Sequence, residues 1–424
     1  MAFRSIFMIF ILLGVVWIAG CGRQAVISDP EMVETLHGKE ISIISFWHSY
    51  SDEETRVLEE ELIPAFERQH PNIRVNSINL AINNELRNTL ITLASSNRGP
   101  DVVRIELAWV PEFTHKGLLE PINGYSGYGD IIHLFHREAM RVGFDQKQLY
   151  SLPLDIYVKS AIFNRELLER AGYSEPPRTL HDVIEVARQN RYTIGLGGWE
   201  PWDTLPYIYS LGGALMDDHF TKSTGFLNSE ETVQAVKVLH SLYRENLLHF
   251  SRMNDRSDNW IGVKTGNVLM TDEGPWYYSK LEGAELDRTL KQTIPVPFPR
   301  GNGSASIMGG NHLVIMKGSR NPVQAWTFMK WMTGKEAQLT MAKTGLIPTN
   351  LEARSAWTVN RDSYLYPYVE ATDDAFLRPP VKNWGNIEQV YTGFMSKIFL
   401  GELTVQEGLD RAAAEIDLLL GDTD

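Results

Sequence analysis

The chain has 424 residues, of which 43% are apolar and 22% charged, with 33 glycines and 20 prolines. These proportions are typical of a folded globular protein and exclude low-complexity, collagen-like and disordered chains, and the length predicts two or three lobes. The net charge is −13 and no cluster of lysine and arginine stands out, which argues against nucleic acid as a partner. The single cysteine, Cys21, excludes an internal disulfide and a cysteine zinc site.

The first thirty residues have the pattern of an export signal. Arg4 supplies a short positive start, and residues 6–18 form an almost unbroken apolar run of thirteen residues. A membrane-spanning helix needs about 20 apolar residues, so the run favours a signal peptide over a permanent span. Either a cleaved signal or an uncleaved anchor places the rest of the chain outside the cytoplasmic membrane.

The end of this segment explains the lone cysteine. Ile18-Ala19-Gly20-Cys21 resembles a bacterial lipobox, in which the cysteine thiol receives a diacylglycerol and becomes the first residue of the mature chain. We therefore expect a lipoprotein signal peptide over residues 1–20, a lipidated Cys21 that carries acyl chains such as palmitate, and a polar tether over 21–37. The alternative is an uncleaved N-terminal anchor with an incidental cysteine.

The elements after the tether alternate between strand and helix. Residues 41–47 are β-branched and aromatic, which predicts a buried strand. Ser51 and Glu54 have the spacing of a capping box and predict that a helix begins there, with an apolar face. That face consists of Val57, Leu58, Leu62 and Phe66.

Two further strands and a helix complete the βαβ pattern. Residues 73–78 and 101–105 read as strands and residues 84–95 as the helix between them. This order predicts an α/β fold of mostly parallel sheets flanked by helices. Later helices are expected over residues 179–189, 229–244, 321–333 and 404–420, several of them behind a Ser, Thr or Asn cap.

No fixed-period repeat and no long linker separates the expected lobes, so short crossing segments must join them. The candidates are residues 151–160, 295–306 and 345–350. Two lobes joined more than once leave a cleft between them. The predicted division is a first lobe of residues 38–154 and 306–346 and a second lobe of residues 155–305 and 347–424.

Signatures of catalysis and of cofactor binding are missing. The chain has no nucleophile elbow, phosphate loop, HExxH motif or complete GxGxxG, and we expect no cofactor. His133, His136 and Glu138 have a spacing that a metal could use, but their polar neighbours favour an ordinary surface helix. We therefore expect no metal site.

The distribution of aromatic residues is more informative. A tryptophan in a loop presents a flat apolar face and an indole N–H, which suit the C–H face and hydroxyls of a pyranose, and nearby carboxylates or amides can bind those hydroxyls. Trp326 and Trp331 lie instead in an amphipathic helix and are expected in the core. The loop tryptophans are Trp47, Trp109, Trp199, Trp202, Trp276 and Trp384, and the polar candidates are Glu106, Asp155, Glu200, Glu273, Asn311 and Asn383.

Several runs of the chain, taken together, resemble a known family. They include GKEISIISFWHSYSDEETRVLEEELIPAFERQHPNIRV, GPDVVRIELAWVPEFTHKGLLEPI, LYSLPLDIYVKSAIFNRELLERAGYSEPPRTLHDV, EGPWYYSKL, ASIMGGNHLVIMKGSRNPVQAWTFMKWMTGKEAQ and TGLIPTN. They resemble the family 1 extracellular solute-binding proteins, the sugar-binding components of bacterial ATP-binding-cassette (ABC) importers, similar to maltose- and trehalose-binding proteins. The resemblance covers residues 38–420 in order and implies a type II two-lobed fold, three hinge crossings and a cleft that closes on the sugar.

The resemblance also implies which residues line the cleft. Gly310 and Asn311 follow the family's pattern only in part, because the family often has Trp or Tyr after the two glycines where this chain has Asn311 and His312. Trp384 could supply that stacking surface. The implied ligand-binding residues are His48, Ser49, Glu106, Trp109, Asp155, Tyr157, Trp199, Glu200, Trp202, Trp276, Gly310, Asn311 and Trp384.

The resulting hypothesis is a membrane-anchored extracellular or periplasmic receptor, expected to be a monomer, that binds a carbohydrate without turnover and delivers it to the transmembrane subunits of an ABC permease. One alternative is a binding protein for another solute such as glycerol phosphate, a polyamine or iron. The candidate loops are acidic and aromatic, which disfavours an anionic ligand. The other alternative is a secreted glycosidase, since a pair of catalytic carboxylates cannot be recognised in one sequence.

Overall fold

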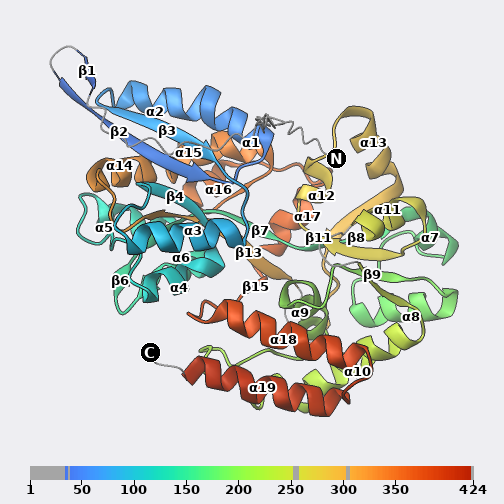
Figure 1. Ribbon diagram of the computed structural model, residues 1–424. Helices are drawn as coiled ribbons and strands as arrows, with labels where there is room; N and C mark the ends of the chain where they lie inside the picture. The colour runs from blue at the N-terminus through green and yellow to red at the C-terminus, as the bar shows by residue number, and fades with distance from the viewer. Residues whose placement is uncertain (1–33, 37–38, 252–256, 302–305, 422–424) are drawn as a thin grey trace, which may run out of the picture.

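The structure is a computed structural model that describes residues 34–36, 39–251, 257–301 and 306–421. Two mixed β-sheets, each covered by helices, form two lobes that lie side by side (Figure 1). The predicted signal peptide, Cys21 and most of the tether lie outside the described residues. Within those residues, no helix combines the length and the apolar character that a membrane crossing requires.

The first lobe is built on an eight-stranded sheet with the order β1-β2-β4-β13-β7-β14, in which β3 also pairs with β2 and β15 with β13. Its strands are β1 (Glu34–Leu36), β2 (Lys39–His48), β3 (Ile73–Asn79), β4 (Val102–Glu106), β7 (Ser151–Val158), β13 (Ile307–Ile315), β14 (Ile347–Pro348) and β15 (Phe376–Leu377). A separate hairpin joins β5 (Phe144–Asp145) and β6 (Gln148–Leu149).

The second lobe is built on a five-stranded sheet with the order β10-β9-β11-β8-β12. Its strands are β8 (Ser160–Asn164), β9 (Ile194–Leu196), β10 (Leu248–Phe250), β11 (Met270–Glu273) and β12 (Thr293–Pro297).

Short helices cover the first sheet. They are α1 (Asp52–Val57), α2 (Ile63–Gln69), α3 (Asn84–Ser95), α4 (Val110–His115), α5 (Tyr128–Ile131), α6 (Arg137–Val142), α14 (Pro322–Met332), α15 (Lys335–Met341) and α16 (Leu351–Ala356). A π-helical segment, η1 (Leu58–Leu62), joins α1 to α2. Three 3₁₀ turns are η2 (Leu107–Trp109), η3 (Ile132–Leu134) and η4 (Ala342–Thr344).

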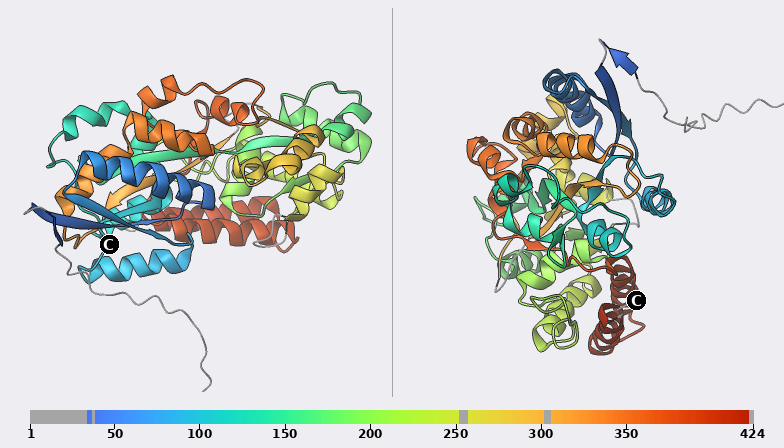
Figure 2. Two further views of the ribbon diagram at one scale, coloured as in Figure 1. Left: turned by 90° about the horizontal axis from the view of Figure 1, so that it is seen from above. Right: turned by 90° about the vertical axis from the view of Figure 1, so that its left-hand side faces the viewer.

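The second lobe carries the longest helices. They are α7 (Arg165–Arg170), α8 (Leu180–Asn190), α9 (Pro201–Ser210), α10 (Glu230–Arg244), α11 (Ser257–Thr265), α12 (Trp276–Ser279), α13 (Gly283–Gln292), α17 (Tyr366–Ala371), α18 (Trp384–Phe399) and α19 (Val405–Gly421). The last two form a hairpin that runs along one side of the molecule and packs against α10 (Figure 2).

The predicted capping box at the start of α1 is confirmed. The Ser51 hydroxyl accepts a hydrogen bond from the Glu54 N–H, and the Glu54 carboxylate accepts one from the Ser51 N–H. The four residues of the predicted apolar face are buried, although the helix contains the π-helical segment η1. The four later helices begin and end within one residue of their predicted bounds.

The sheets are more mixed than the βαβ pattern indicates. β2, β3 and β4 run parallel, as predicted, but β13 runs antiparallel to both β4 and β7. The reason is the path of the chain, because β7 leaves the first sheet toward the second lobe and β13 returns from that lobe. In the second sheet β8 is likewise antiparallel to β11 and β12.

Two of the three candidate crossings lie where the chain passes between the sheets. The first passes from β7 to β8, with Lys159 as the only residue between them, and the second passes from β12 to β13. The third candidate, residues 345–350, stays in the first lobe, since β14 pairs with β7 and α16 packs on α15. The chain instead reaches the second lobe through α17, returns to β15, and leaves again into α18.

This path differs in detail from the predicted lobe boundaries. β7 continues in the first sheet as far as Val158, beyond the predicted boundary at residue 154. β14 and β15 also pair in the first sheet, although both follow residue 346. The predicted residue ranges of the two lobes therefore remain a prediction. The end of β7, β14 and β15 are the segments that pair in the first sheet although the prediction assigns them to the second lobe.

His312, in β13, is a buried titratable residue in the centre of the first sheet. It is 1% exposed, and its Nδ1 lies 2.8 Å from the Ser151 hydroxyl. Burial lowers its pKa to about 3 from the usual 6.5. Below pH 6.5 the imidazole of His312 therefore binds a proton in the unfolded chain, whereas in the folded chain it binds one only near pH 3. The neutral, buried His312 thus contributes its full stabilisation above pH 6.5, and this stabilisation is lost as the pH falls.

We expect the free energy of unfolding to fall by about 2 kcal/mol between pH 8 and pH 5 on account of His312. Urea unfolding of the wild type and of His312→Gln at the two pH values measures this contribution, and the variant should show the smaller pH dependence. Equal pH dependence of the two proteins would contradict the assignment.

Candidate functional site

Arg378, in the segment after β15, contacts residues of both lobes. Its guanidinium forms an ion pair with Glu106, at the end of β4, and its Cζ lies 5.6 Å from the ring centroid of Trp202 in α9. The residue is only 7% exposed. Burial opposes the charge, but Glu106, Tyr157 and Glu388 outweigh it and hold the pKa of Arg378 above its usual value.

Trp202, next to this arginine, belongs to a group of three aromatic side chains. The ring of Tyr157, in β7, makes edge-to-face contacts with Trp202 at 5.8 Å and with Trp276 at 5.2 Å. We call Tyr157, Trp202 and Trp276 the aromatic cluster. All three are half-buried, and burial, followed by the charge of Glu106, raises the pKa of the Tyr157 phenol, which stays protonated. The cluster thus combines apolar ring faces with a hydroxyl donor where the lobes meet.

Two glycines, which have no side chain, make room for these rings. A Cβ on Gly309 would lie 2.2 Å from the Tyr157 ring, and a Cβ on Gly274 would lie 2.3 Å from the Trp276 ring. The predicted site residue Gly310 lies against the β7 backbone, where a Cβ would be 2.5 Å from the Asp155 carbonyl oxygen. The glycine pair in β13 is therefore explained by close packing of Tyr157 and of the neighbouring strand.

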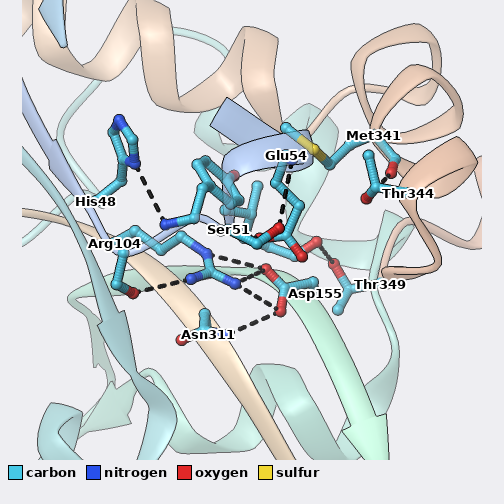
Figure 3. A network of polar contacts seen from close by, with 12 residues as sticks. His48, Ser51, Glu54, Arg104, Asp155, Asn311, Met341, Thr344 and Thr349 are labelled. Atoms are coloured by element: carbon cyan, nitrogen blue, oxygen red, sulfur yellow. Dashed lines mark hydrogen bonds and ion pairs between the residues drawn. The ribbon is translucent and has the colours of Figure 1, made fainter. Parts of the chain in front are cut away.

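A second polar network connects three strands of the first sheet, β4, β7 and β13, with the turn after β2 (Figure 3). The Arg104 guanidinium bonds the Asp155 carboxylate at 3.1 Å and donates to the Ser49 hydroxyl at 3.0 Å. The Asn311 amide donates to the same carboxylate at 2.8 Å. Arg104 also lies over the ring of Tyr50, with its Cζ 4.4 Å from the centroid. Arg104 therefore connects Ser49 to Asp155, and Asp155 in turn bonds Asn311.

His48 caps the end of β2. Its Nε2 lies 2.8 Å from the Ser77 hydroxyl, and its Nδ1 accepts the Tyr50 N–H at 3.3 Å. Burial, and then the charge of Arg104, lower the pKa of His48 to about 4, so the ring is neutral at pH 7. These contacts give His48 a role in the turn that positions Ser49.

The other predicted tryptophans lie apart from the aromatic cluster. Trp109 stacks on Phe113 at 6.2 Å, and Trp199 contacts Phe250 edge to face at 5.7 Å. Trp384 is 4% exposed at the first turn of α18, one turn before Glu388. Among the ring contacts of the described residues, none joins these three to the cluster.

Two more acidic side chains approach the junction. Glu200 precedes α9 and lies beside Gly198, where a Cβ would be 3.0 Å from its Oε2. Glu388 in α18 faces Arg378, and burial raises the pKa of its carboxyl group although the charge of Arg378 opposes that effect. Carboxyl groups therefore outnumber cations around the cluster.

Sequence reasoning missed the cations of the junction. Arg104, Lys159 and Arg378 were not among the predicted residues, and each is at most 7% exposed. A signal was present for Arg104 and Lys159, because each is a charged residue inside an otherwise apolar run, and a buried cation requires a partner. Arg378 has no such signal, since its partner Glu106 lies 272 residues away.

Other potential sites are less developed. In the part of the chain that the structure describes, no three His, Cys, Asp or Glu residues are grouped to hold a metal ion. His136, one of the residues considered for metal, caps α6 instead. A surface pocket of about 750 Å³ lies on the second lobe, away from the aromatic cluster, between β10 and α11.

The family comparison accounts for this architecture. The model of the bacterial extracellular solute-binding protein family matches residues 61–365. The chain belongs to that family.

Relatives with a known ligand include the maltotriose-binding protein of Pyrococcus abyssi (strain GE5 / Orsay), 23% identical over 325 residues that cover 72% of this chain and 67% of the relative. A second relative, from Brucella abortus (strain 2308), is 25% identical over 375 residues, 85% of this chain and 89% of the relative.

Among solved structures, the GacH receptor of Streptomyces glaucescens superposes with a TM-score of 0.79 at 24% identity, covering 91% of this chain and all of that one. Maltose-bound MalE3 of T. maritima superposes with a TM-score of 0.73 at 20% identity, covering 89% of this chain and all of that one. The two-lobed fold of this family, type II among periplasmic binding proteins, is therefore that of the present chain.

Gly309→Ala tests the packing of the aromatic cluster. The added Cβ would displace the Tyr157 ring, so we expect a loss of about 1–3 kcal/mol in the free energy of unfolding. We also expect a changed near-ultraviolet circular dichroism spectrum.

The matched control is Gly393→Ala, which is exposed within α18 and has nothing within 4 Å of the added Cβ. It should stabilise the protein by about 0.5–1 kcal/mol, because glycine is unfavourable in a helix. A Gly309→Ala variant with wild-type stability and spectrum would contradict the packing described here.

Proposed function

We propose that this protein is the carbohydrate-binding receptor of an ABC importer, which captures a mono- or oligosaccharide at the junction of its lobes and delivers it to the transmembrane subunits of a permease. The observation that carries the proposal is the aromatic cluster beside the Glu106–Arg378 ion pair. Half-buried ring faces suit the C–H face of a pyranose, and a carboxylate with a guanidinium can bind neighbouring hydroxyls.

Three buried N–H groups support a hydroxyl-rich ligand. Arg378 Nε, Trp384 Nε1 and Trp199 Nε1 have no hydrogen-bond partner among the described residues. A buried N–H without an acceptor is costly, and the oxygen atoms of a sugar are suitable acceptors. We propose Arg378 as a further ligand-binding residue. The others remain those of the sequence analysis: His48, Ser49, Glu106, Trp109, Asp155, Tyr157, Trp199, Glu200, Trp202, Trp276, Gly310, Asn311 and Trp384.

The relatives support the same class of ligand. The Pyrococcus abyssi relative binds maltotriose, the GacH receptor was solved with acarbose, and the T. maritima protein was solved with maltose. Ligands of this kind offer several pyranose-like rings that could stack on the cluster. We propose a neutral glycan of similar size as the first candidate ligand.

The alternatives fit the junction less well. The two arginines are each paired with a carboxylate, so an anionic ligand such as glycerol phosphate would have to compete with Glu106 or Asp155. The acidic surroundings would tolerate a polyamine, which belongs in the ligand panel below. We propose binding without turnover, since the family consists of solute-binding proteins.

Motion of the lobes forms part of the proposal. Tyr157 belongs to the first sheet, and Trp202 and Trp276 belong to the second lobe, so a ligand held by all three would stabilise a closed arrangement. A ligand shifts such an equilibrium only through its different affinity for the open and closed forms. The one-residue crossing between β7 and β8 provides a hinge in this proposal.

Calorimetry of the mature protein against a panel of sugars, glycerol phosphate, spermidine and ferric iron tests the proposal. We expect a dissociation constant in the micromolar range or below for at least one sugar, corresponding to about −8 kcal/mol. Trp276→Ala should weaken that binding by about 2 kcal/mol, because a stacking surface is lost.

Trp331→Phe serves as the control. Trp331 contacts Phe66 edge to face within the first lobe. The affinity of this variant for sugar should therefore equal that of the wild type. No detectable binding of any sugar, together with tight binding of another solute in the panel, would refute the carbohydrate proposal.

We further propose that the receptor is a monomer attached to the outer side of the cytoplasmic membrane by lipid on Cys21. Two or more acyl chains give stable attachment where one gives marginal attachment, so Cys21→Ser should yield a released protein or an uncleaved precursor. Membrane fractionation and mass spectrometry of the mature N-terminus measure this. A wild-type chain that retains residues 1–20 and an unmodified thiol would rule out the lipid anchor.

A further inference from the structure

Lys159 is the only residue between β7, which belongs to the first sheet, and β8, which belongs to the second. β7 ends at Val158 and β8 begins at Ser160. The Lys159 N–H bonds the carbonyl oxygen of Ile307 at 3.4 Å, and its carbonyl oxygen accepts a hydrogen bond from the Ser306 hydroxyl. Both strand crossings between the lobes therefore meet at this one residue.

The side chain of Lys159 is directed into the second lobe. It is fully buried, and its Nζ lies 2.8 Å from Asp203 Oδ1 and 2.7 Å from Asp272 Oδ2. The ammonium also donates to the carbonyl oxygen of Trp202 at 3.2 Å. Asp272 is held in turn by the Tyr207 hydroxyl, which donates to its other oxygen at 3.0 Å.

These contacts connect the crossing to the aromatic cluster. Asp203 directly follows Trp202, and Asp272 lies four residues before Trp276. Tyr157 precedes Lys159 by two residues, and in an extended chain such residues point to the same side. The short segment from Tyr157 to Lys159 thus places the Tyr157 ring against both tryptophans and the Lys159 ammonium against the two aspartates near them in sequence.

Stability alone does not explain this arrangement. Burying an ammonium and two carboxylates carries a large desolvation cost, and well-packed apolar residues of similar volume stabilise a protein as well or better. Burial also raises the pKa of Asp272, even though Lys159 opposes that shift. A paired buried charge does, however, fix the direction of its partners, because any displacement leaves a charge uncompensated.

We propose that Lys159 is a positioning residue for ligand binding. It holds Trp202 and Trp276 in the orientation in which they face Tyr157, and it makes the hinge residue a rigid part of the second lobe, so that rotation between lobes occurs on the Val158 side of the crossing. This proposal rests on the proposed carbohydrate-binding function. Lys159 acts through the tryptophans and does not itself contact the sugar.

The test uses the uncharged variant Lys159→Met/Asp203→Asn/Asp272→Asn, which keeps the side-chain volumes and removes all three charges. The probe is maltotriose, or the sugar of the panel that the wild type binds most tightly. We expect this variant to fold, to bind at least tenfold more weakly, and to lose most of the ligand-induced decrease in radius of gyration that small-angle scattering records for the wild type.

The control is Leu239→Ala, a substitution of a buried α10 residue in the core of the same lobe. It should lower the melting temperature but retain both the affinity and the change in radius of gyration, which separates positioning from general loss of stability. A folded uncharged variant with wild-type affinity would overturn the proposal.

A second variant keeps the test decisive if the triple substitution does not fold. Asp203→Asn retains the volume and the pairing of Lys159 with Asp272, and we expect a threefold to tenfold loss of affinity. Unchanged affinity in this variant would overturn the role of Lys159. A wild type that binds no sugar would refute the proposed function instead, so the two failures can be distinguished.

Discussion

Three cations near the junction of the lobes are almost completely withdrawn from water. Because an isolated buried charge is far more costly than a paired one, each requires a carboxylate at a defined position, and those carboxylates come from other elements. The arrangement of β4, β7, α9 and β11 around the junction depends on these pairings. The pairs are Arg104 with Asp155, Arg378 with Glu106, and Lys159 with Asp203 and Asp272.

The same constraint explains why the predicted polar residues divide into two groups. Asp155 bonds both Arg104 and Asn311 within the first sheet, whereas Glu106 is turned toward Arg378 and Trp202 at the junction. Residues that are adjacent in register therefore have different roles. Asp155 keeps the ends of the strands aligned, and Glu106 remains partly exposed beside the aromatic cluster.

Local elements were predictable from sequence because their causes are local. The capping box of Ser51 and the apolar periodicity of α8 depend on residues a few positions apart. The antiparallel direction of β13 and the place of β14 depend on the path of the whole chain, which no local pattern encodes. The site shows the same division. The sequence predicts Trp202 and Trp276 in loops, but they lie in the first turns of α9 and α12. Only tertiary packing separates Trp202, beside Arg378, from Trp109, which stacks on Phe113.

The position of β13 has a consequence for the order in which the protein folds. β13 lies between β4 and β7, and its residue Asn311 pairs with Glu106, 205 residues earlier in the chain. The first sheet therefore lacks its middle strand until all five strands of the second sheet have been synthesised. Pairings between such distant segments are slow to form, since a long loop must close before any contact is gained. Each lobe has its own sheet, yet the first cannot complete its folding before the second has emerged.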